Sequence, residues 1–257
     1  PVCVGKATKL ADRIGGESKG YRAVLKLGIV TDSYDLEGHE VERNPVGHYD
    51  DGVIRQALTS FLGEQEQLPP VYSAIKVGGK KLYEYALSGQ SVEIKPRKCT
   101  IFAIGLVERI AEDEFSFDVL CSKGTYIRSI CHDLGKMLGC GGAMKRLIRT
   151  SSGNFHINEA YMLEEVAELK GDALTKVEDY FAEKERLFVL EGAVPFIENG
   201  NPVIFKNLTE DSKEKFLGLS EGDEALILDG ERLLGLGTKR KYDSEKGFAM
   251  ILSYRHC

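Results

Sequence analysis

The stretch FSFDVLCSKGTYIRSICHDLGKMLG, residues 115–139, combines the two patterns that decide the fold class. Residues 115–121 alternate apolar and polar side chains, which predicts a half-buried strand. From Thr125 onward the apolar side chains recur every three to four residues, which predicts a helix that ends at Gly139. The chain therefore passes from a strand, through a turn with a glycine, into a helix.

The sequence on the N-terminal side extends this mixed pattern. Residues 100–110 are rich in apolar side chains and are followed by a polar Glu-Asp turn, which predicts a hairpin with the strand just described. Residues 21–28 alternate like a further strand. Asp50 is a typical helix N-cap, and the apolar side chains of residues 53–62 recur at helical spacing. Strands and helices thus occur together, as in an α+β fold.

The C-terminal side differs in character. Residues 159–186 are acidic and predict exposed helices, whereas short strands and turns follow. The Asp229-Gly230 step between apolar residues is a strong hairpin signal. We therefore predict a core over residues 1–187 and a small β-rich domain over residues 188–257.

Composition restricts the class of protein. The chain has 257 residues and is 42% hydrophobic, enough for one large core or for one large and one small core. No apolar run approaches the roughly 18 residues of a membrane span, and the start has no signal-peptide layout. We therefore expect a protein that does not enter a membrane, and the cysteines favour the cytoplasm. Six scattered cysteines without a CxxC pair are expected to be reduced and mostly buried thiols: Cys3, Cys99, Cys121, Cys131, Cys140 and Cys257.

Charge is segregated along the chain. The net charge of −6 argues against an overall attraction to nucleic acid. Residues 70–97 nevertheless hold five basic against two acidic residues, and residues 122–150 hold six against one. Such segments are compatible with a local phosphate-binding surface. Charge alone favours ordinary solvated lysines and leaves both interpretations open.

The polar residues at the strand-to-helix junction are the densest group with chemical potential. The turn at residues 121–128 presents backbone N–H groups where the helix begins. Tyr126 is suited to stacking on a base, and Arg128 is a permanent cation that can hold a carboxylate with two hydrogen bonds. Taken alone, this motif is better explained as a surface turn whose arginine pairs with a nearby acid.

Five pieces of the chain resemble the TruB family of tRNA pseudouridine synthases, in the family's order, over about residues 1–160. The pieces are PVCVGKATK (1–9), KGYRA (19–23) with TDSYDLEG (31–38), YSAIK (72–76) with GKKLYEYA (79–86), SKGTYIR (122–128) and LIRTSSGNF (147–155).

The resemblance implies a mixed, mainly antiparallel sheet with flanking helices, followed by a small PUA-like, β-barrel-like domain. It also implies a cofactor-free isomerisation of the T-loop uridine of tRNA. The uridine is flipped out of its stack, its bond to the ribose is broken, and the base is rejoined through C5. An Asp acts as the nucleophile. The expected partner is the T stem-loop of tRNA, and we expect a monomer because RNA would occupy the basic face.

The resemblance also predicts that the catalytic Asp of the family is missing from residues 1–257. The family's catalytic Asp belongs to a Gly-Thr-Leu-Asp-Pro-type motif just ahead of the segment that opens with Pro1, and neither Asp12, Asp32 nor Asp35 stands in its place. We therefore expect the nucleophile to lie upstream of Pro1 and Arg128 to be an unpaired cation without it. The alternative is an inactive tRNA-binding fragment or module. A thiol or zinc enzyme that uses Cys121, Cys131 and His132 is a third hypothesis, although their spacing matches no zinc motif and we expect no metal.

Few residues carry over from the family by position. Tyr21 corresponds to the tyrosine that packs against the flipped base and takes part in proton transfer. Arg128 corresponds to the arginine that pairs with the catalytic Asp. Tyr126 and Leu147 correspond to positions that line the nucleotide pocket. Without the resemblance, Tyr21 would be interpreted as a core aromatic and Leu147 as part of a helix core.

Basic residues of the same segments are the expected phosphate ligands. Residues 70–97 resemble the family's RNA-gripping insertion. Ile148 and Ser151 stand where family members more often carry basic residues. This weakens the expectation that the whole segment around Arg146 and Arg149 binds RNA. The predicted RNA contacts, which would give a salt-dependent affinity, are Lys76, Lys80, Lys81, Lys123, Arg146 and Arg149.

Overall fold

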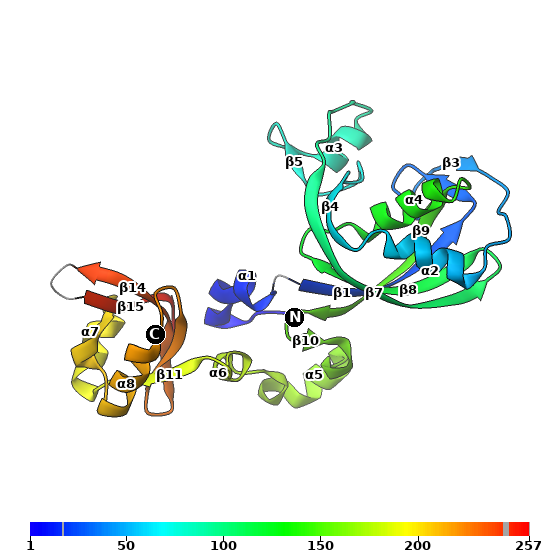
Figure 1. Ribbon diagram of the computed structural model, residues 1–257. Helices are drawn as coiled ribbons and strands as arrows, with labels where there is room; N and C mark the ends of the chain where they lie inside the picture. The colour runs from blue at the N-terminus through cyan, green and yellow to red at the C-terminus, as the bar shows by residue number, and fades with distance from the viewer. Residues whose placement is uncertain (17, 244–246, 257) are drawn as a thin grey trace. The chain divides into compact units, whose positions relative to one another are not determined.

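The computed structural model describes residues 1–16, 18–243 and 247–256 (Figure 1). The chain forms two compact units. The central unit is Gly16–Ala160, and the terminal unit combines Pro1–Gly15 with Tyr161–Cys257. Residues 161–187 thus belong to the terminal unit, whereas the sequence analysis assigned them to the core. The domain boundary at residues 187 and 188 remains a prediction.

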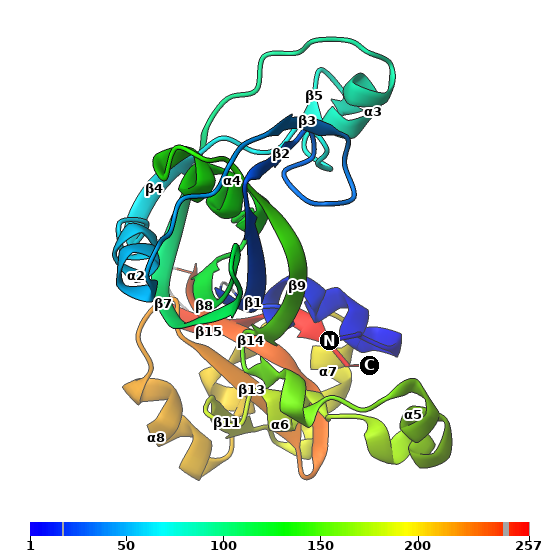
Figure 2. The ribbon, with the colours of Figure 1, turned by 90° about the vertical axis from the view of Figure 1, so that its right-hand side faces the viewer.

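A six-stranded sheet forms the centre of the central unit, in the order β10-β9-β1-β8-β7-β4. Every neighbouring pair in it is antiparallel, so the expected mainly antiparallel α+β core is confirmed. The sheet is strongly curved (Figure 2). Its strands are β1 (Ser18–Leu27), β4 (Gly63–Gln67), β7 (Arg97–Ala111), β8 (Glu114–Ser122), β9 (Gly142–Ser152) and β10 (Phe155–His156).

Two helices, α2 (Asp51–Thr59) and α4 (Ile127–Met137), pack their apolar sides into one core with this sheet. The Asp50 carboxylate caps α2 by accepting a hydrogen bond from the backbone N–H of Val53 at 2.9 Å, as predicted. Helix α4 approaches β9 closely because glycines face each other there. A Cβ added to Gly135 would come within 2.0 Å of the backbone nitrogen of Gly142. This close packing fixes the helix that begins at the candidate site.

Two short hairpins complete the central unit. Strands β2 (Ile29–Thr31) and β3 (Glu40–Arg43) pair around a loop, and β5 (Lys76–Val77) and β6 (Lys80–Lys81) form the start of the insertion. Helix α3 (Leu82–Leu87) follows β6 directly. The 3-10 helix η2 (Ile157–Glu159) ends the unit.

The terminal unit contains a five-stranded sheet in the order β11-β13-β14-β15-β12. Its strands are β11 (Glu185–Phe188), β12 (Val203–Ile204), β13 (Glu224–Asp229), β14 (Arg232–Asp243) and β15 (Gly247–Arg255). Its helices are η1 (Gly5–Leu10), α1 (Ala11–Ile14), α5 (Leu163–Leu169), η3 (Lys170–Ala173), α6 (Val177–Tyr180), η4 (Glu191–Ala193), α7 (Val194–Glu198), η5 (Phe205–Asn207) and α8 (Glu210–Gly218). The hairpin predicted at Asp229-Gly230 joins β13 to β14.

The structure corrects one local interpretation and agrees with others. Leu147, which the bare sequence suggested as part of a helix core, lies in strand β9 and is 39% exposed. The described cysteines are free, and four of the five are buried, as expected; Cys257 lies outside the described residues. No helix in the described ranges is both long and apolar enough to cross a membrane.

Candidate functional site

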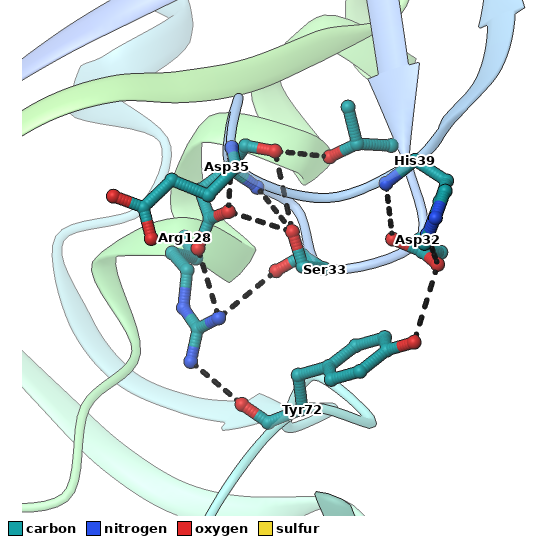
Figure 3. Close-up of polar contacts among 8 residues, drawn as sticks. Asp32, Ser33, Asp35, His39, Tyr72 and Arg128 are labelled. Carbon is teal, nitrogen blue, oxygen red and sulfur yellow. Dashed lines mark hydrogen bonds and ion pairs between the residues drawn. The ribbon is translucent and has the colours of Figure 1, made fainter. Parts of the chain in front are cut away.

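Arg128, at the start of α4, is the hub of a partly buried polar network (Figure 3). Its Nη1 donates to the Asp35 carboxylate at 3.0 Å and to the Ser33 carbonyl at 3.2 Å. Its Nη2 donates to the carbonyl of Tyr72 at 2.8 Å. The expectation of an unpaired cation is therefore wrong: Asp35, dismissed as a nucleophile because of its position, supplies the countercharge. The sequence signal for this pairing was only the acidic, turn-rich composition of the loop.

The loop between β2 and β3 holds Asp35 in a fixed orientation. One oxygen of its carboxylate faces Arg128, and the other accepts hydrogen bonds from the Ser33 hydroxyl at 2.6 Å and the Glu37 N–H at 3.1 Å. The Thr31 hydroxyl donates to the Asp35 carbonyl at 2.6 Å. A carboxylate bonded on both oxygens cannot rotate away from the arginine without losing these partners.

Buried polar groups also fix the start of α4. The backbone N–H of Tyr126 donates to the Gln67 side chain at 2.7 Å, and the Gln67 amide donates back to the Tyr126 carbonyl at 2.9 Å. The Ser129 hydroxyl donates to the carbonyl of Leu68 at 2.9 Å. Tyr126 is the N-cap residue, and the helix begins at Ile127 rather than at the predicted Thr125. Strand β4 and helix α4 are thereby held together just before Arg128.

Tyr72 connects the insertion to the same loop. Its hydroxyl donates to the Asp32 carboxylate at 3.4 Å, while its carbonyl receives the Arg128 hydrogen bond (Figure 3). The charge of Asp32 raises the pKa of the Tyr72 hydroxyl. Asp32 also accepts from the backbone of His39 at 2.9 Å. Two segments that are distant in the sequence, residues 31–38 and the start of the insertion, therefore meet at one guanidinium.

Tyr21 lies on β1, half-buried against the hydrophobic core and in register with Val119 and Arg149. Burial raises the pKa of Tyr21, the neighbouring Cys121 adds to this, and the Arg149 guanidinium offsets part of it. Leu147 lies two residues before Arg149 on β9 and is exposed. The described contacts bring Tyr21 together with Arg149 and bring Arg128 together with Asp35; none of them joins these two groups.

The predicted phosphate ligands lie on two surfaces. Lys76, Lys80 and Lys81 lie on the β5–β6 hairpin, and the Nζ atoms of Lys80 and Lys81 lie 5.9 and 5.4 Å from the ring centroids of Tyr85 and Tyr83. This hairpin and α3 stand apart from the six-stranded sheet (Figure 1). The other three residues are exposed on the turn after β8 and on β9: Lys123, Arg146 and Arg149.

The thiol and histidine of α4 have packing partners. Cys131 is buried, and burial raises the pKa of its thiol far above the ordinary value. The imidazole of His132 stacks on Tyr34. In the part of the chain that the structure describes, no three His, Cys, Asp or Glu side chains are grouped as metal ligands would be.

Comparisons with known proteins match this arrangement to one family. The model of the TruB family pseudouridylate synthase N-terminal domain matches residues 1–127, and that of the tRNA pseudouridylate synthase B C-terminal domain matches residues 128–186. The tRNA pseudouridine synthase B of Alkaliphilus oremlandii is 37% identical over 98% of this chain and 83% of its own length. The Clostridium perfringens (strain ATCC 13124) protein of the same name is 39% identical over 97% of this chain and 82% of its own length.

Solved structures share the fold at lower identity. An H/ACA ribonucleoprotein bound to a substrate RNA containing 2′-deoxyuridine matches 99% of this chain and 70% of its own with a TM-score of 0.63 and 20% identity. A Cbf5-Nop10-Gar1 complex matches 97% and 69% with a TM-score of 0.63 and 22% identity. Because relatives at 37% and 39% identity match nearly the whole chain, the chain belongs to the TruB family of pseudouridylate synthases.

Proposed function

We propose that this tRNA pseudouridine synthase isomerises the T-loop uridine of tRNA without a cofactor. The observation that carries the proposal is the placement of Arg128, which is a permanent cation with a side chain 22% exposed, at the start of α4 in a member of this family. A guanidinium has five N–H donors. The described contacts use three of them. The remaining donors suit a second carboxylate, the nucleophilic Asp.

The proposed reaction divides the work among few groups. We propose that the nucleophilic Asp lies ahead of Pro1 and that Arg128 keeps this Asp ionised and oriented towards the flipped uridine. Tyr21 would pack against the flipped base from β1 and take part in proton transfer. Tyr126 and Leu147 would line the nucleotide pocket. Flipping is required because the bond to the ribose cannot be reached while the uridine is stacked in the loop.

We further propose that the substrate is gripped through its T stem by the basic residues of the two surfaces. Lysine contacts to phosphates give affinity rather than sequence selectivity. We expect the double variant Lys76→Ala/Lys80→Ala to bind T-arm RNA more weakly, with a logarithmic salt dependence shallower by about one unit per lysine. Lys215→Ala, a surface change on α8, is the matched control and should leave the slope unaltered. An unchanged slope in the double variant would show that these lysines do not contact the RNA.

We further propose that the protein is a cytoplasmic monomer.

The decisive experiment measures pseudouridine formation in T-arm RNA by two forms of the protein. One form is residues 1–257, and the other carries a Gly-Thr-Leu-Asp-Pro-type segment ahead of Pro1. We expect conversion by the extended form and RNA binding without conversion by residues 1–257. If residues 1–257 convert the RNA, the assignment of the nucleophile is wrong. If neither form converts it, the alternative of a tRNA-binding module gains support.

A further inference from the structure

Tyr34 adopts a backbone conformation that bulky residues seldom adopt. Its φ is +66°, and it stands between Ser33 and Asp35, the two loop residues that accept hydrogen bonds from Arg128. Positive φ values suit glycine, because a side chain there crowds the backbone. Such a residue persists only where its surroundings hold it, and it is often found at functional sites.

The surroundings that hold Tyr34 are identifiable. Its ring stacks on His132, with centroids 3.9 Å apart and planes 15° from parallel. His132 lies on α4 four residues after Arg128, one helical turn further along the same side. The backbone N–H of Met144 on β9 donates to the Tyr34 carbonyl at 2.9 Å. The loop is thus tied to β9 through its backbone, and to α4 through this aromatic contact as well as through the hydrogen bonds of Arg128.

The imidazole contributes its ring face rather than its hydrogen-bonding capacity. The Nδ1 atom of His132 is buried and has no hydrogen-bond partner among the described residues. Burial lowers the pKa of His132, which favours the neutral ring that stacks without carrying a charge. Burial likewise raises the pKa of Tyr34 and keeps its hydroxyl protonated. Two neutral rings in offset-stacked contact attract each other beyond the area that they bury.

We propose that the Tyr34–His132 stack is a positioning device for Arg128, tying the loop that supplies its ligands to the helix that carries it. Loss of the Tyr34 ring frees the backbone at residue 34 to rotate, towards the ordinary negative φ in an Ala variant and over both signs of φ in a Gly variant. That rotation carries the Ser33 carbonyl and the Asp35 carboxylate away from the guanidinium. This inference rests on the proposed function only where it predicts rates; the geometry of Arg128 is testable without it.

Substitutions at residue 34 separate the ring from the backbone. Tyr34→Phe keeps the ring, Tyr34→Ala removes it, and Tyr34→Gly removes it while accommodating φ at +66° without strain. In the extended form of the protein we expect kcat to fall about tenfold or more in the Ala and Gly variants, because small displacements of a positioned group cost rate steeply. We expect KM to stay within about twofold, because the proposed RNA-binding lysines lie elsewhere. Tyr34→Phe should retain the wild-type kcat.

Tyr49→Ala is the matched control. Tyr49 packs against the same core and donates to the carbonyl of Leu138 at the far end of α4 at 2.8 Å, so its loss should lower stability and leave kcat unchanged. Nitrogen-15 NMR of the Arg128 guanidinium supplies a readout independent of turnover. Its signals should be sharp in the wild type and Tyr34→Phe, and averaged by rotation in Tyr34→Gly.

The inference is overturned if Tyr34→Gly keeps both full kcat and sharp guanidinium signals, because the ring would then be dispensable. It is also overturned if Tyr34→Phe fails, or if Tyr49→Ala lowers kcat as much as Tyr34→Ala. If the wild type converts no RNA, the proposed function fails. The NMR comparison still decides the positioning role in that case.

Discussion

Each of the two units holds a cation that is at least partly buried, but the hydrogen-bond partners of the two cations differ in kind. Arg128 in the central unit binds one carboxylate and two carbonyls that come from two separate loop segments. Lys239 in the terminal unit is 6% exposed and donates to the carbonyls of Phe216 and Leu219, at 2.7 and 2.6 Å, where α8 ends. Its Nζ also lies 4.5 Å from the centroid of the Phe216 ring.

The difference indicates what each cation is for. Lys239 donates to carbonyls that the end of α8 leaves without partners, and an aromatic ring lies beside it, so these contacts stabilise the packing of α8 on β14. Arg128 joins two segments distant in the sequence and keeps N–H groups beyond those that the described contacts use. A cation that holds two loop segments together and keeps further N–H groups available is suited to bind a substrate or a catalytic group. Substitutions at the two cations and at their partners test whether this contrast holds.

The largest effect is expected from Arg128→Ala in the extended form. Removing the cation leaves Asp35 and the nucleophile without their shared partner, and we expect kcat to fall at least about a hundredfold, as when a preorganised charge is removed from an active site. Single-turnover pseudouridine formation measures this. Arg128→Lys restores the charge but not the forked geometry and should recover only a small part of the rate. Near-normal turnover in Arg128→Ala would place the catalytic arginine elsewhere.

A smaller loss of rate is expected from Asp35→Asn, which keeps the shape and removes the charge. Charged hydrogen bonds contribute about 1.5–3 kcal/mol, so we expect a roughly ten- to hundredfold lower kcat. The same assay measures it, with circular dichroism to establish that the variant is folded. Glu37→Gln is the matched control, because it removes one negative charge from the same loop and Glu37 bonds Asp35 through its backbone N–H and not through its exposed side chain. An Asp35→Asn variant as active as the wild type would make the ion pair purely structural.

Lys239→Met tests the other side of the comparison. The substitution keeps the apolar stem but leaves two buried carbonyls without their donor, so we expect a loss of about 1–3 kcal/mol in the free energy of unfolding. Urea denaturation measures it, and kcat below the unfolding transition should stay unchanged. Lys241→Met, an exposed position two residues further along β14, controls for the change of residue type. A fall in kcat without a loss of stability would mean that Lys239 is not merely structural.

The sequence predicted those parts of the fold that depend on local pattern. The cap at Asp50, the hairpin at Asp229-Gly230 and the helix after the glycine turn follow from periodicity and turn chemistry. Strand β9 was missed, because its exposed Arg146-Leu147 segment lacks strict alternation and its partner, β1, lies over a hundred residues earlier. Pairing between distant segments leaves no local signal.

The site shows the same limit. Arg128 and Tyr126 were found from their motif, yet the partner of Arg128 was not, because the contact between Asp35 and Arg128 spans 93 residues. The positive φ of Tyr34 was equally hidden, since nothing in its side chain favours that conformation. Residue type indicated which groups carry chemistry, and tertiary packing decided which of them meet.

The smallest effect is expected at a second ion-pair group of the central unit, which provides a baseline for Arg128 and Asp35. The Glu114 carboxylate accepts from Lys145 at 2.7 Å and from Lys26 at 3.3 Å. Hydrogen bonding by Lys145 is the main cause that lowers the pKa of Glu114 below its ordinary value. A carboxyl group whose pKa is lowered by folding stabilises the folded state at pH values above its unfolded-state pKa. This contribution is lost as the pH falls through the folded-state pKa.

Glu114→Gln should therefore lose at most about 1 kcal/mol in the free energy of unfolding at neutral pH and nothing in strong acid, because the lysine partners are partly exposed. Urea denaturation of wild type and variant from pH 7 down to pH 3 measures the difference, and Glu108→Gln serves as a control for removing one charge. A difference in the free energy of unfolding that grows towards acid would contradict the expected sign. It would mean that folding raises the pKa of Glu114 rather than lowering it.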